Sequence, residues 1–314
     1  MKLILNDKNS VEILKAFTNN QIDLIKAKYP KENNPILISV VNNEMVRIQK
    51  LFDHYRSMGI QNFVILDNNS TDGTKEWLCK QTDCEVYSTE ETYTTQKREA
   101  WINRLISYYG FNRWYLVVDS DEHFVYQDME TNDINHFISQ IKLKGYKRVR
   151  SLMLDMYPKS NVFSQTELDR NNDFISKYSY FDKNTYTIKK ESFGLIVQGG
   201  PRKRIFNLNV YLTKHPLFYF QHGDIQAHSH YQYPYKKNKD LPCFSALLHY
   251  KFLDSDISKY KERVKAGSFY NGSEEYRNYL NLFNNNESVN FFYEGSVKYE
   301  NSNSLKEIKL LQKI

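Results

Sequence analysis

Three acidic residues stand directly after an apolar run in the segment WYLVVDSDEHF, residues 114–124. Two of them, Asp119 and Asp121, are spaced i and i+2, so their carboxylates can converge on one hard cation. Such a cation prefers oxygen ligands and can keep coordination sites for substrate phosphates. The alternative is a solvated strand end, and Glu122 by itself fits that alternative well. Because a lone D-x-D pattern is common in loops, the surrounding elements must decide between the two.

Apolar runs alternate with helical patterns between Pro35 and Asp155. In the helical segments apolar residues recur every three or four positions, as Met45, Ile48 and Leu51 do, which is the period of a helix packed on one face. This alternation predicts an α/β fold with a Rossmann-like, mostly parallel sheet flanked by helices. The predicted strands are 36–41, 62–67, 84–88, 114–119 and 147–154, and the predicted helices are 45–58, 74–80, 94–109 and 132–144.

Beyond Asp155 the alternation fades, but the chain has no internal repeat and no long linker, so one elaborated domain is expected. We expect an N-terminal helical segment at 1–32 with a helix over 8–29, an α/β domain at 33–255, and a helical C-terminal extension at 256–314 that packs on it. Further strands are predicted near 186–197, 203–206, 217–221 and 245–252, and further helices at 256–266, 273–284 and 304–313.

The tail SLKEIKLLQKI places Leu305, Ile308 and Leu311 on one side of its predicted helix and lysines elsewhere. An amphipathic tail of this kind could dock on the domain, join two copies into a homodimer or contact a membrane surface. Docking is the simplest of the three.

The composition is that of a globular protein: 314 residues, 40% hydrophobic, with a net charge of +6. The mild positive excess suits an anionic substrate or membrane surface, whereas no basic block or known motif points to nucleic acid. The apolar runs are too short to span a membrane, and the first residues lack the apolar core of a signal peptide. Three cysteines form neither a metal-ligand pattern nor an even disulfide framework. A cytoplasmic location is expected, at most peripheral at the cytoplasmic face of the inner membrane.

Polar clusters follow four of the predicted strands: 42–44, 67–74, 119–122 and Asp155. In doubly wound sheets ligands bind at the carboxyl ends of the strands, so these clusters are expected to meet at one edge. Asp67 ends an apolar strand, and its carboxylate could accept hydrogen bonds from a base or a ribose. Neither GxGxxG nor GxxxxGK[ST] is present, so a nucleotide would not be held as NAD is, or as ATP is in a P-loop.

Several basic residues and histidines in the second half could contact a ligand. Arg202 lies in GGPRKR, where two glycines would let the backbone approach a ligand closely and an arginine can fork onto phosphate or carboxylate; the alternative is a basic turn that enters a strand. Lys251 could face a diphosphate. His228 and His230 have a metal-like spacing but lack the following Asp and His of zinc hydrolases, so a contact with donor or acceptor is favoured.

The segments ILISVVNNE, FVILDNNSTDGT and WYLVVDSDEHF together resemble family 2 glycosyltransferases with the GT-A fold. The resemblance is greatest to a bacterial branch that carries KNE, DNxSTDGT and D-x-DE. It continues through LMLDMYP, YSYFD, GGPRKRIF, TKHPLFYF and LLHYKF, and so extends over residues 35–285.

The resemblance implies a metal-dependent, inverting glycosyltransferase of the hexosyltransferase type. It would move a sugar from a nucleotide-sugar, a UDP-sugar being the first expectation, to a hydroxyl of a glycan or lipid-linked glycan. The expected setting is bacterial surface polysaccharide synthesis, capsule or lipopolysaccharide, and the expected cofactor is Mn²⁺ or Mg²⁺. The implied donor-binding residues are Asn42, Glu44, Asp67, Asn69, Arg98, Asp119, Arg202 and Lys251, and the implied metal ligands are Asp119, Asp121 and His249.

Inversion requires a general base that takes the proton of the acceptor hydroxyl while the diphosphate leaves. Asp155 follows an apolar strand at the expected ligand edge, and burial there would raise its pKa towards a useful value. We therefore expect Asp155 to be the base, with Asp182 and Glu191 as alternatives.

Two other functions compete with that of a glycosyltransferase. A nucleotidyltransferase would normally carry a glycine-rich loop after the first strand, and SVVNNE has no glycine. The alternative from another class is a non-catalytic nucleotide- or sugar-binding module with a GT-A-like fold, which would bind the donor without turning it over.

Overall fold

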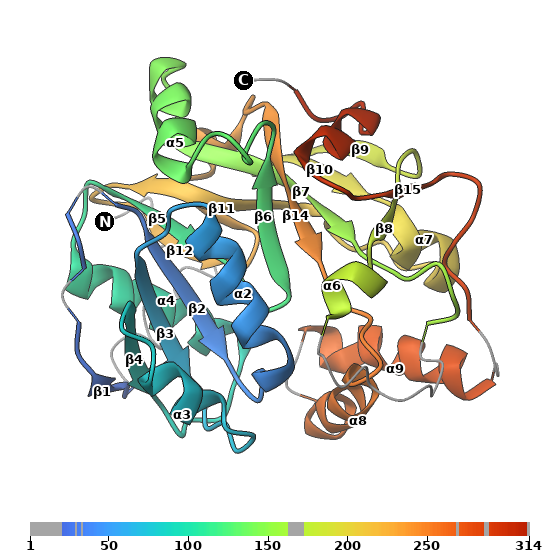
Figure 1. Cartoon of the computed structure of the whole chain (residues 1–314), viewed down its shortest axis with the longest axis horizontal. Coiled ribbons are helices and arrows are strands. Elements are labelled where there is room, and N and C mark those ends of the chain that lie inside the picture. Colours follow the sequence, from blue (N-terminus) through green and yellow to red (C-terminus); the bar gives the residue numbers. More distant parts are fainter. Residues whose placement is uncertain are drawn as a thin grey trace.

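The computed structural model describes residues 21–28, 30–32, 34–162, 173–267, 270–285 and 289–312. A nine-stranded sheet forms its centre (Figure 1). In spatial order the strands are β1 (Asp23–Lys26), β4 (Cys84–Ser88), β3 (Asn62–Asp67), β2 (Ile36–Val41), β5 (Arg113–Val117), β11 (Thr213–Phe220), β7 (Arg148–Asp155), β14 (Cys243–His249) and β6 (Glu122–Tyr126).

Six of the nine strands run in the same direction. β4, β3, β2 and β5 pair in parallel, β7 and β14 pair in parallel, and β11 lies antiparallel to both β5 and β7, so the two groups share one direction. β1 and β6 close the two edges as antiparallel strands. The predicted α/β class with a mostly parallel sheet flanked by helices is confirmed.

Helices cover both faces of the sheet, because successive strand residues point to opposite sides and both sides are apolar. The face with Ile36, Ile38 and Val64 packs against α4 (Thr95–Tyr109), and the face with Leu37 and Ile65 packs against the other helices of the first half. These are α2 (Met45–Ser57), α3 (Thr74–Cys79) and α5 (Ile134–Leu143).

The second half adds short elements around this sheet. They are α6 (Phe174–Lys177), β8 (Tyr180–Asp182), β9 (Thr187–Glu191), β10 (Gly194–Gln198), α7 (Gly200–Phe206), β12 (Ile225–His228), β13 (Tyr231–Tyr233), η1 (Tyr235–Asn238) and β15 (Ser296–Lys298). The C-terminal helices α8 (Asp256–Ala266) and α9 (Tyr270–Asn285) lie together at one end of the molecule (Figure 1). Their aromatic residues, such as Tyr260 and Tyr279, form a cluster with Phe252 and Phe291.

Four expectations about secondary structure are wrong. Residues 23–26 form an edge strand that pairs with β4, although a helix was expected over 8–29; residues 8–20 and 29 of that predicted helix lie outside the described residues. Residues 203–206 belong to α7, whose start is favoured by Pro201 in the first turn. The tail forms the 3₁₀ helix η2 (Ser302–Glu307).

The fourth error is β6, which was not expected to be a strand at all. The acidic cluster was expected to be either a cation site or a solvated strand end, but the segment from Glu122 onward forms β6, which is fully buried and pairs with β14. The tail is also packed on the sheet, since Leu305 and Ile308 are buried in the main core. None of the helices among the described residues combines the length and the apolar character needed to cross a membrane.

Candidate metal and nucleotide site

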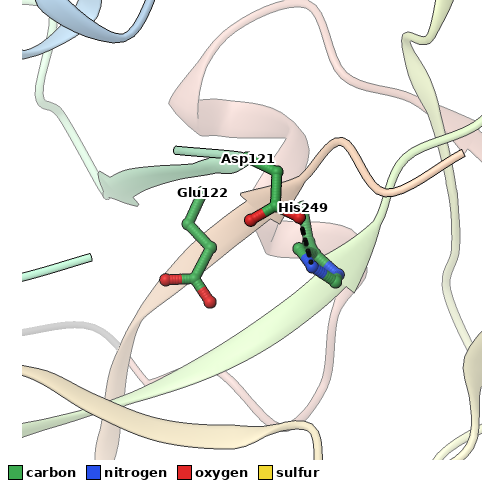
Figure 2. A group of neighbouring side chains, drawn as sticks. All are labelled: Asp121, Glu122 and His249. Atoms are coloured by element: carbon green, nitrogen blue, oxygen red, sulfur yellow. Dashed lines mark ion pairs between the residues drawn. The ribbon is translucent and has the colours of Figure 1, made fainter. Parts of the chain in front are cut away.

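Strand register brings the key side chains together at the carboxyl edge of the sheet. In the register, His249 at the end of β14 lies opposite both Glu122 of β6 and Asp155 of β7. Asp121 comes just before β6, and its carbonyl accepts a hydrogen bond from the Tyr250 amide at 2.8 Å. Residues from three separate parts of the chain therefore meet at one point. Figure 2 shows Asp121, Glu122 and His249 of this group.

His249 is held between two carboxylates. Its Nδ1 lies 2.6 Å from Asp155 Oδ1, and its Nε2 lies 3.4 Å from Asp121 Oδ2 (Figure 2). One ligand atom each of Asp121, Glu122 and His249 lies within 4.8 Å of the others. A histidine that is oriented by a carboxylate behind it is the usual arrangement at protein metal sites. The donor set therefore fits Mn²⁺ or Mg²⁺, with Asp121 and His249 as the residues that would hold the ion.

The charges at this point stabilise one another. Burial acts to lower the pKa of His249, but the Asp121 and Asp155 carboxylates outweigh it and raise the pKa. Burial acts to raise the pKa of Asp121, but His249 and the more distant Lys251 and Arg47 hold it well below its usual range.

The expected rise in the pKa of Asp155 is wrong. Burial favours the neutral acid, but the guanidinium of Arg202 and then His249 outweigh it, so the pKa of Asp155 is lowered. Arg202 Nε lies 2.8 Å from Asp155 Oδ2, and the carboxylate is 1% exposed. The residue expected to be the base is thus an ionised side chain that orients His249 and neutralises Arg202.

The two alternative bases lie in different surroundings. Asp182 is fully buried and accepts hydrogen bonds from Arg204 and from the Tyr157 hydroxyl, so it ties α7 to β8. Glu191 is exposed at the end of β9. Asp182 therefore has the contacts of a structural residue.

Asp119 and Glu122 share a lysine that the sequence analysis did not single out. Lys214 Nζ lies 3.0 Å from Asp119 Oδ2 and 2.6 Å from Glu122 Oε2. Arg98 contacts the other oxygen of Asp119 and also pairs with Glu99 at 2.8 Å. Arg98 and then Lys214 outweigh the effect of burial and lower the pKa of Asp119.

The interpretation of Glu122 as a solvated residue is wrong, because only 1% of it is exposed. A buried carboxylate needs compensation by charge or hydrogen bonds, and Glu122 receives it from Lys214 and from the backbone amide of Asp119 at 3.0 Å. The sequence does contain a sign of this pairing, because Lys214 is a charged residue within the otherwise strand-like segment TKHPLFYF.

The expected nucleotide-binding residues after β2 and β3 fall into two groups. Asp67 is fully buried; its Oδ1 accepts a hydrogen bond from the Ser70 amide at 3.0 Å, and its Oδ2 has no hydrogen-bond partner. Asn42 instead donates hydrogen bonds to the backbone carbonyls of Asn68 and Asn69, at 2.7 and 3.4 Å. Asn42 and Asn69, both predicted to bind the donor, therefore help to build the turn. Asp67 therefore keeps one buried oxygen without a hydrogen-bond partner.

A small polar hollow lies beside Asp121, and the C-terminal extension forms part of its wall. It is lined by Glu44, Arg47, Asp121, Lys251, Asp256, Tyr260 and Arg263. Glu44 is paired with Lys259 at 2.9 Å and with Arg47 at 3.4 Å. Lys251 lies 3.8 Å from Glu275 of α9. Arg47 and Glu275 are further charged residues that the sequence did not reveal, because Arg47 pairs with Asp256 and Glu275 with Arg202 and Lys251, all in distant segments.

The first glycine of GGPRKR allows a close approach within the chain itself. A Cβ at Gly199, whose φ is +134°, would lie 2.1 Å from the Thr185 carbonyl oxygen, so the close approach is to the chain's own backbone. Arg202 is nonetheless near the site: its Nε binds Asp155, its Nη1 lies 3.3 Å from Glu275, and its Nη2 is buried without a partner.

The pair His228 and His230 is used within the β12–β13 hairpin and in its contact with β11. His230 Nδ1 lies 2.8 Å from the Thr213 carbonyl, and the His230 amide donates to His228 Nδ1 at 3.2 Å. Burial, followed by Arg98 and Lys214, lowers the pKa of His228 to about 4. The pair is absent from the group of possible metal ligands found among the described residues.

Buried neutral histidines predict that the protein loses stability in mild acid. Burial lowers the pKa of His215 to about 3 and that of His54 to about 4. The unfolded chain titrates these groups near their ordinary value of about 6.5, so it binds more protons than the folded chain below that pH. We expect His215 and His54 each to lower the free energy of unfolding by about 1.4 kcal/mol per pH unit as the pH falls from 6.5 towards 4.

Urea unfolding at pH 7 and pH 5 measures this loss, and His215→Gln should reduce its slope. His249 acts in the opposite direction, since its pKa is raised: its contribution is complete below the unfolded pKa and is lost as the pH rises through the folded one. Equal stability at the two pH values in both proteins would contradict the prediction.

No protein-family model matches the chain, and no curated protein matches it by sequence. Among solved structures, the chain is similar to residues 1–349 of TarS from S. aureus, a wall teichoic acid glycosyltransferase. The two chains are 11% identical, with a TM-score of 0.32. The match covers 74% of this chain and 64% of that one, so this chain spans less than two thirds of the length of the TarS structure.

Proposed function

We propose that this chain is a metal-dependent, inverting glycosyltransferase of the GT-A type, acting on a nucleotide-sugar donor and a glycan or lipid-linked glycan acceptor. The observation that supports it best is His249, which faces Asp121 with Nε2 and is fixed by Asp155 at Nδ1. This pair lies where the D-x-D segment leaves the sheet, at the edge that also carries Asp67. A UDP-sugar is the first donor to test, and bacterial surface polysaccharide is the proposed setting.

In this proposal the chain's residues bind and orient the donor. Asp67 would accept a hydrogen bond from the base or ribose through its unpartnered Oδ2. Asp121 and His249 would hold the cation, while Asp155 keeps the imidazole in place. Arg47 and Lys251 line the hollow beside Asp121 and would face the diphosphate. When bound, the cation would offset the negative charge that develops on the leaving diphosphate.

Thermal unfolding with UDP, GDP or CMP, each with and without Mn²⁺, tests the proposal. One nucleotide should stabilise the protein only when Mn²⁺ is present, because the cation is proposed to bridge the protein and the diphosphate. A ligand at about 100 times its Kd adds about 2.7 kcal/mol to the free energy of unfolding. Stabilisation by none of the three nucleotides would reject the proposal. Release of the nucleotide from a matching nucleotide-sugar then separates an enzyme from a non-catalytic binding module, which would bind without turnover.

Replacing Asp67 with asparagine is expected to weaken nucleotide binding by about tenfold or more and to leave the fold intact. The amide oxygen can still accept the Ser70 hydrogen bond, but the amide nitrogen replaces an acceptor by a donor where the ligand is expected to bind. Titration calorimetry with the nucleotide and Mn²⁺ measures the change. The exposed Asp53 of α2 provides the control as Asp53→Asn, and equal affinities in the two variants would show that Asp67 does not contact the nucleotide.

A further inference from the structure

Lys214 is a buried cation that contacts two of the three carboxylates in the D-x-D-E segment. It lies on β11, between β5 and β7, and only 2% of it is exposed. Its Nζ lies 3.0 Å from Asp119 Oδ2, and 2.8 and 2.6 Å from the two oxygens of Glu122. These three contacts account for all three protons of an ammonium group.

The three carboxylates differ in whether a lysine or arginine neutralises them. Asp119 is paired with both Lys214 and Arg98, and Glu122 is paired with Lys214. Asp121 has His249 as its ion-pair partner and none from lysine or arginine within the described ranges. Of the three, Asp121 is therefore the carboxylate whose charge remains available to a cation.

Glu122 would otherwise be well placed to bind the same cation. A carboxylate oxygen of Glu122 lies within 4.8 Å of ligand atoms of both Asp121 and His249. The Lys214 ammonium group takes one lone pair on each Glu122 oxygen, at 2.8 and 2.6 Å, neutralises the carboxylate and also repels a divalent ion nearby. Without the lysine, the site would offer a third protein ligand and one positive charge less.

We propose that Lys214 is a positioning residue that withholds Glu122 from the cation, so that the protein alone binds a divalent cation weakly. The ion then gains its missing ligands from the diphosphate of the donor, which makes cation binding depend on the nucleotide. This inference rests on the proposed function, because it assumes the cation site at Asp121 and His249.

Binding of Mn²⁺ alone, followed by electron paramagnetic resonance or calorimetry, tests the inference. Lys214→Met should bind Mn²⁺ roughly tenfold more tightly than the wild type, because Glu122 becomes a ligand and a nearby positive charge is removed. The double variant Lys214→Met/Glu122→Gln should lose most of this gain. Lys214→Arg, which keeps the charge, should bind Mn²⁺ as the wild type does.

A gain of affinity distinguishes positioning from a structural role, since damage to the fold would weaken binding. Lys147→Met, at a lysine that contacts Gln221, is the matched control and should leave Mn²⁺ affinity unchanged. Unchanged or weaker Mn²⁺ binding in a folded Lys214→Met protein would overturn the inference. If that variant does not fold, Glu122→Gln by itself tests the inference. The inference expects this variant to bind Mn²⁺ with unchanged affinity. A loss of affinity of fivefold or more, on the order of 1 kcal/mol, would refute it.

The failure of this inference and that of the proposed function give different results. A wild type that binds Mn²⁺ with nucleotide, but whose Lys214→Met variant shows no gain, refutes only the role of Lys214. A wild type that is stabilised by no nucleotide in the presence of Mn²⁺ refutes the proposed function itself.

Discussion

Replacing Asp121 with asparagine is expected to lower kcat/KM for sugar transfer by about a thousandfold or more. Asp121 is the carboxylate of the D-x-D-E segment that has no lysine or arginine partner among the described residues, and it faces His249. An amide is a much poorer ligand for a divalent cation, and the cation is proposed to stabilise the charge that develops on the diphosphate. The loss of that interaction is worth several kcal/mol in the transition state.

The fold should survive this substitution, because Asp121 is 23% exposed at its side chain and anchors the chain through its carbonyl. Steady-state kinetics at saturating Mn²⁺ should therefore show the thousandfold loss of activity, while thermal unfolding shows a folded protein that loses less stability than Asp155→Asn does. Asp53→Asn serves as the control for loss of one carboxylate at the surface. Activity within tenfold of the wild type in Asp121→Asn would show that the cation is bound elsewhere or is not needed.

Replacing Asp155 with asparagine is expected to reduce both stability and cation binding. The carboxylate is paired with the buried Arg202 and with His249. Removing one partner of a buried ion pair commonly costs about 3–5 kcal/mol, since the other charge is left uncompensated. Loss of the group that orients a metal-binding histidine typically lowers metal affinity by about 10–100-fold.

This result would differ from that of a lost general base. A variant that lacks only its base should lose turnover but keep its stability and its affinity for Mn²⁺ with nucleotide. Because the pKa of Asp155 is lowered in the fold, its stabilising contribution is present above its unfolded pKa and is lost as the pH falls through the folded one. Urea unfolding and Mn²⁺ titration in the presence of the nucleotide measure the two effects.

Asp182 offers a matched control for Asp155. It is equally buried and is also paired with an arginine, Arg204, but it has no contact with His249. Asp182→Asn should therefore lower stability and leave Mn²⁺ affinity unchanged. If Asp155→Asn keeps wild-type Mn²⁺ affinity, Asp155 does not position His249 for the ion, and its earlier interpretation as the base returns.

The sequence by itself determined the alternating strands and helices of the first half and the edge where the polar clusters meet. Each of these follows from residues close together in the chain: apolar periodicity defines the strand, and the polar residues that follow mark its carboxyl end. Asp67 and Asp121 could be selected in this way, whereas His249 was implied only by the resemblance to the glycosyltransferase family. Residues 203–206 were mistaken for a strand because a short apolar and basic run has no clear period.

Only the tertiary structure decided which carboxylates are neutralised and by which cations. Lys214 lies 95 residues from Asp119 in sequence, and Arg202 lies 47 residues from Asp155, so neither pairing leaves a local pattern. The distant pairing with Arg202 also reversed the expected pKa shift of Asp155. Burial alone raises the pKa of a carboxyl group, whereas burial beside an arginine can lower it. Electrostatic roles depend on distances across the sheet, and those distances are set by strand order and register.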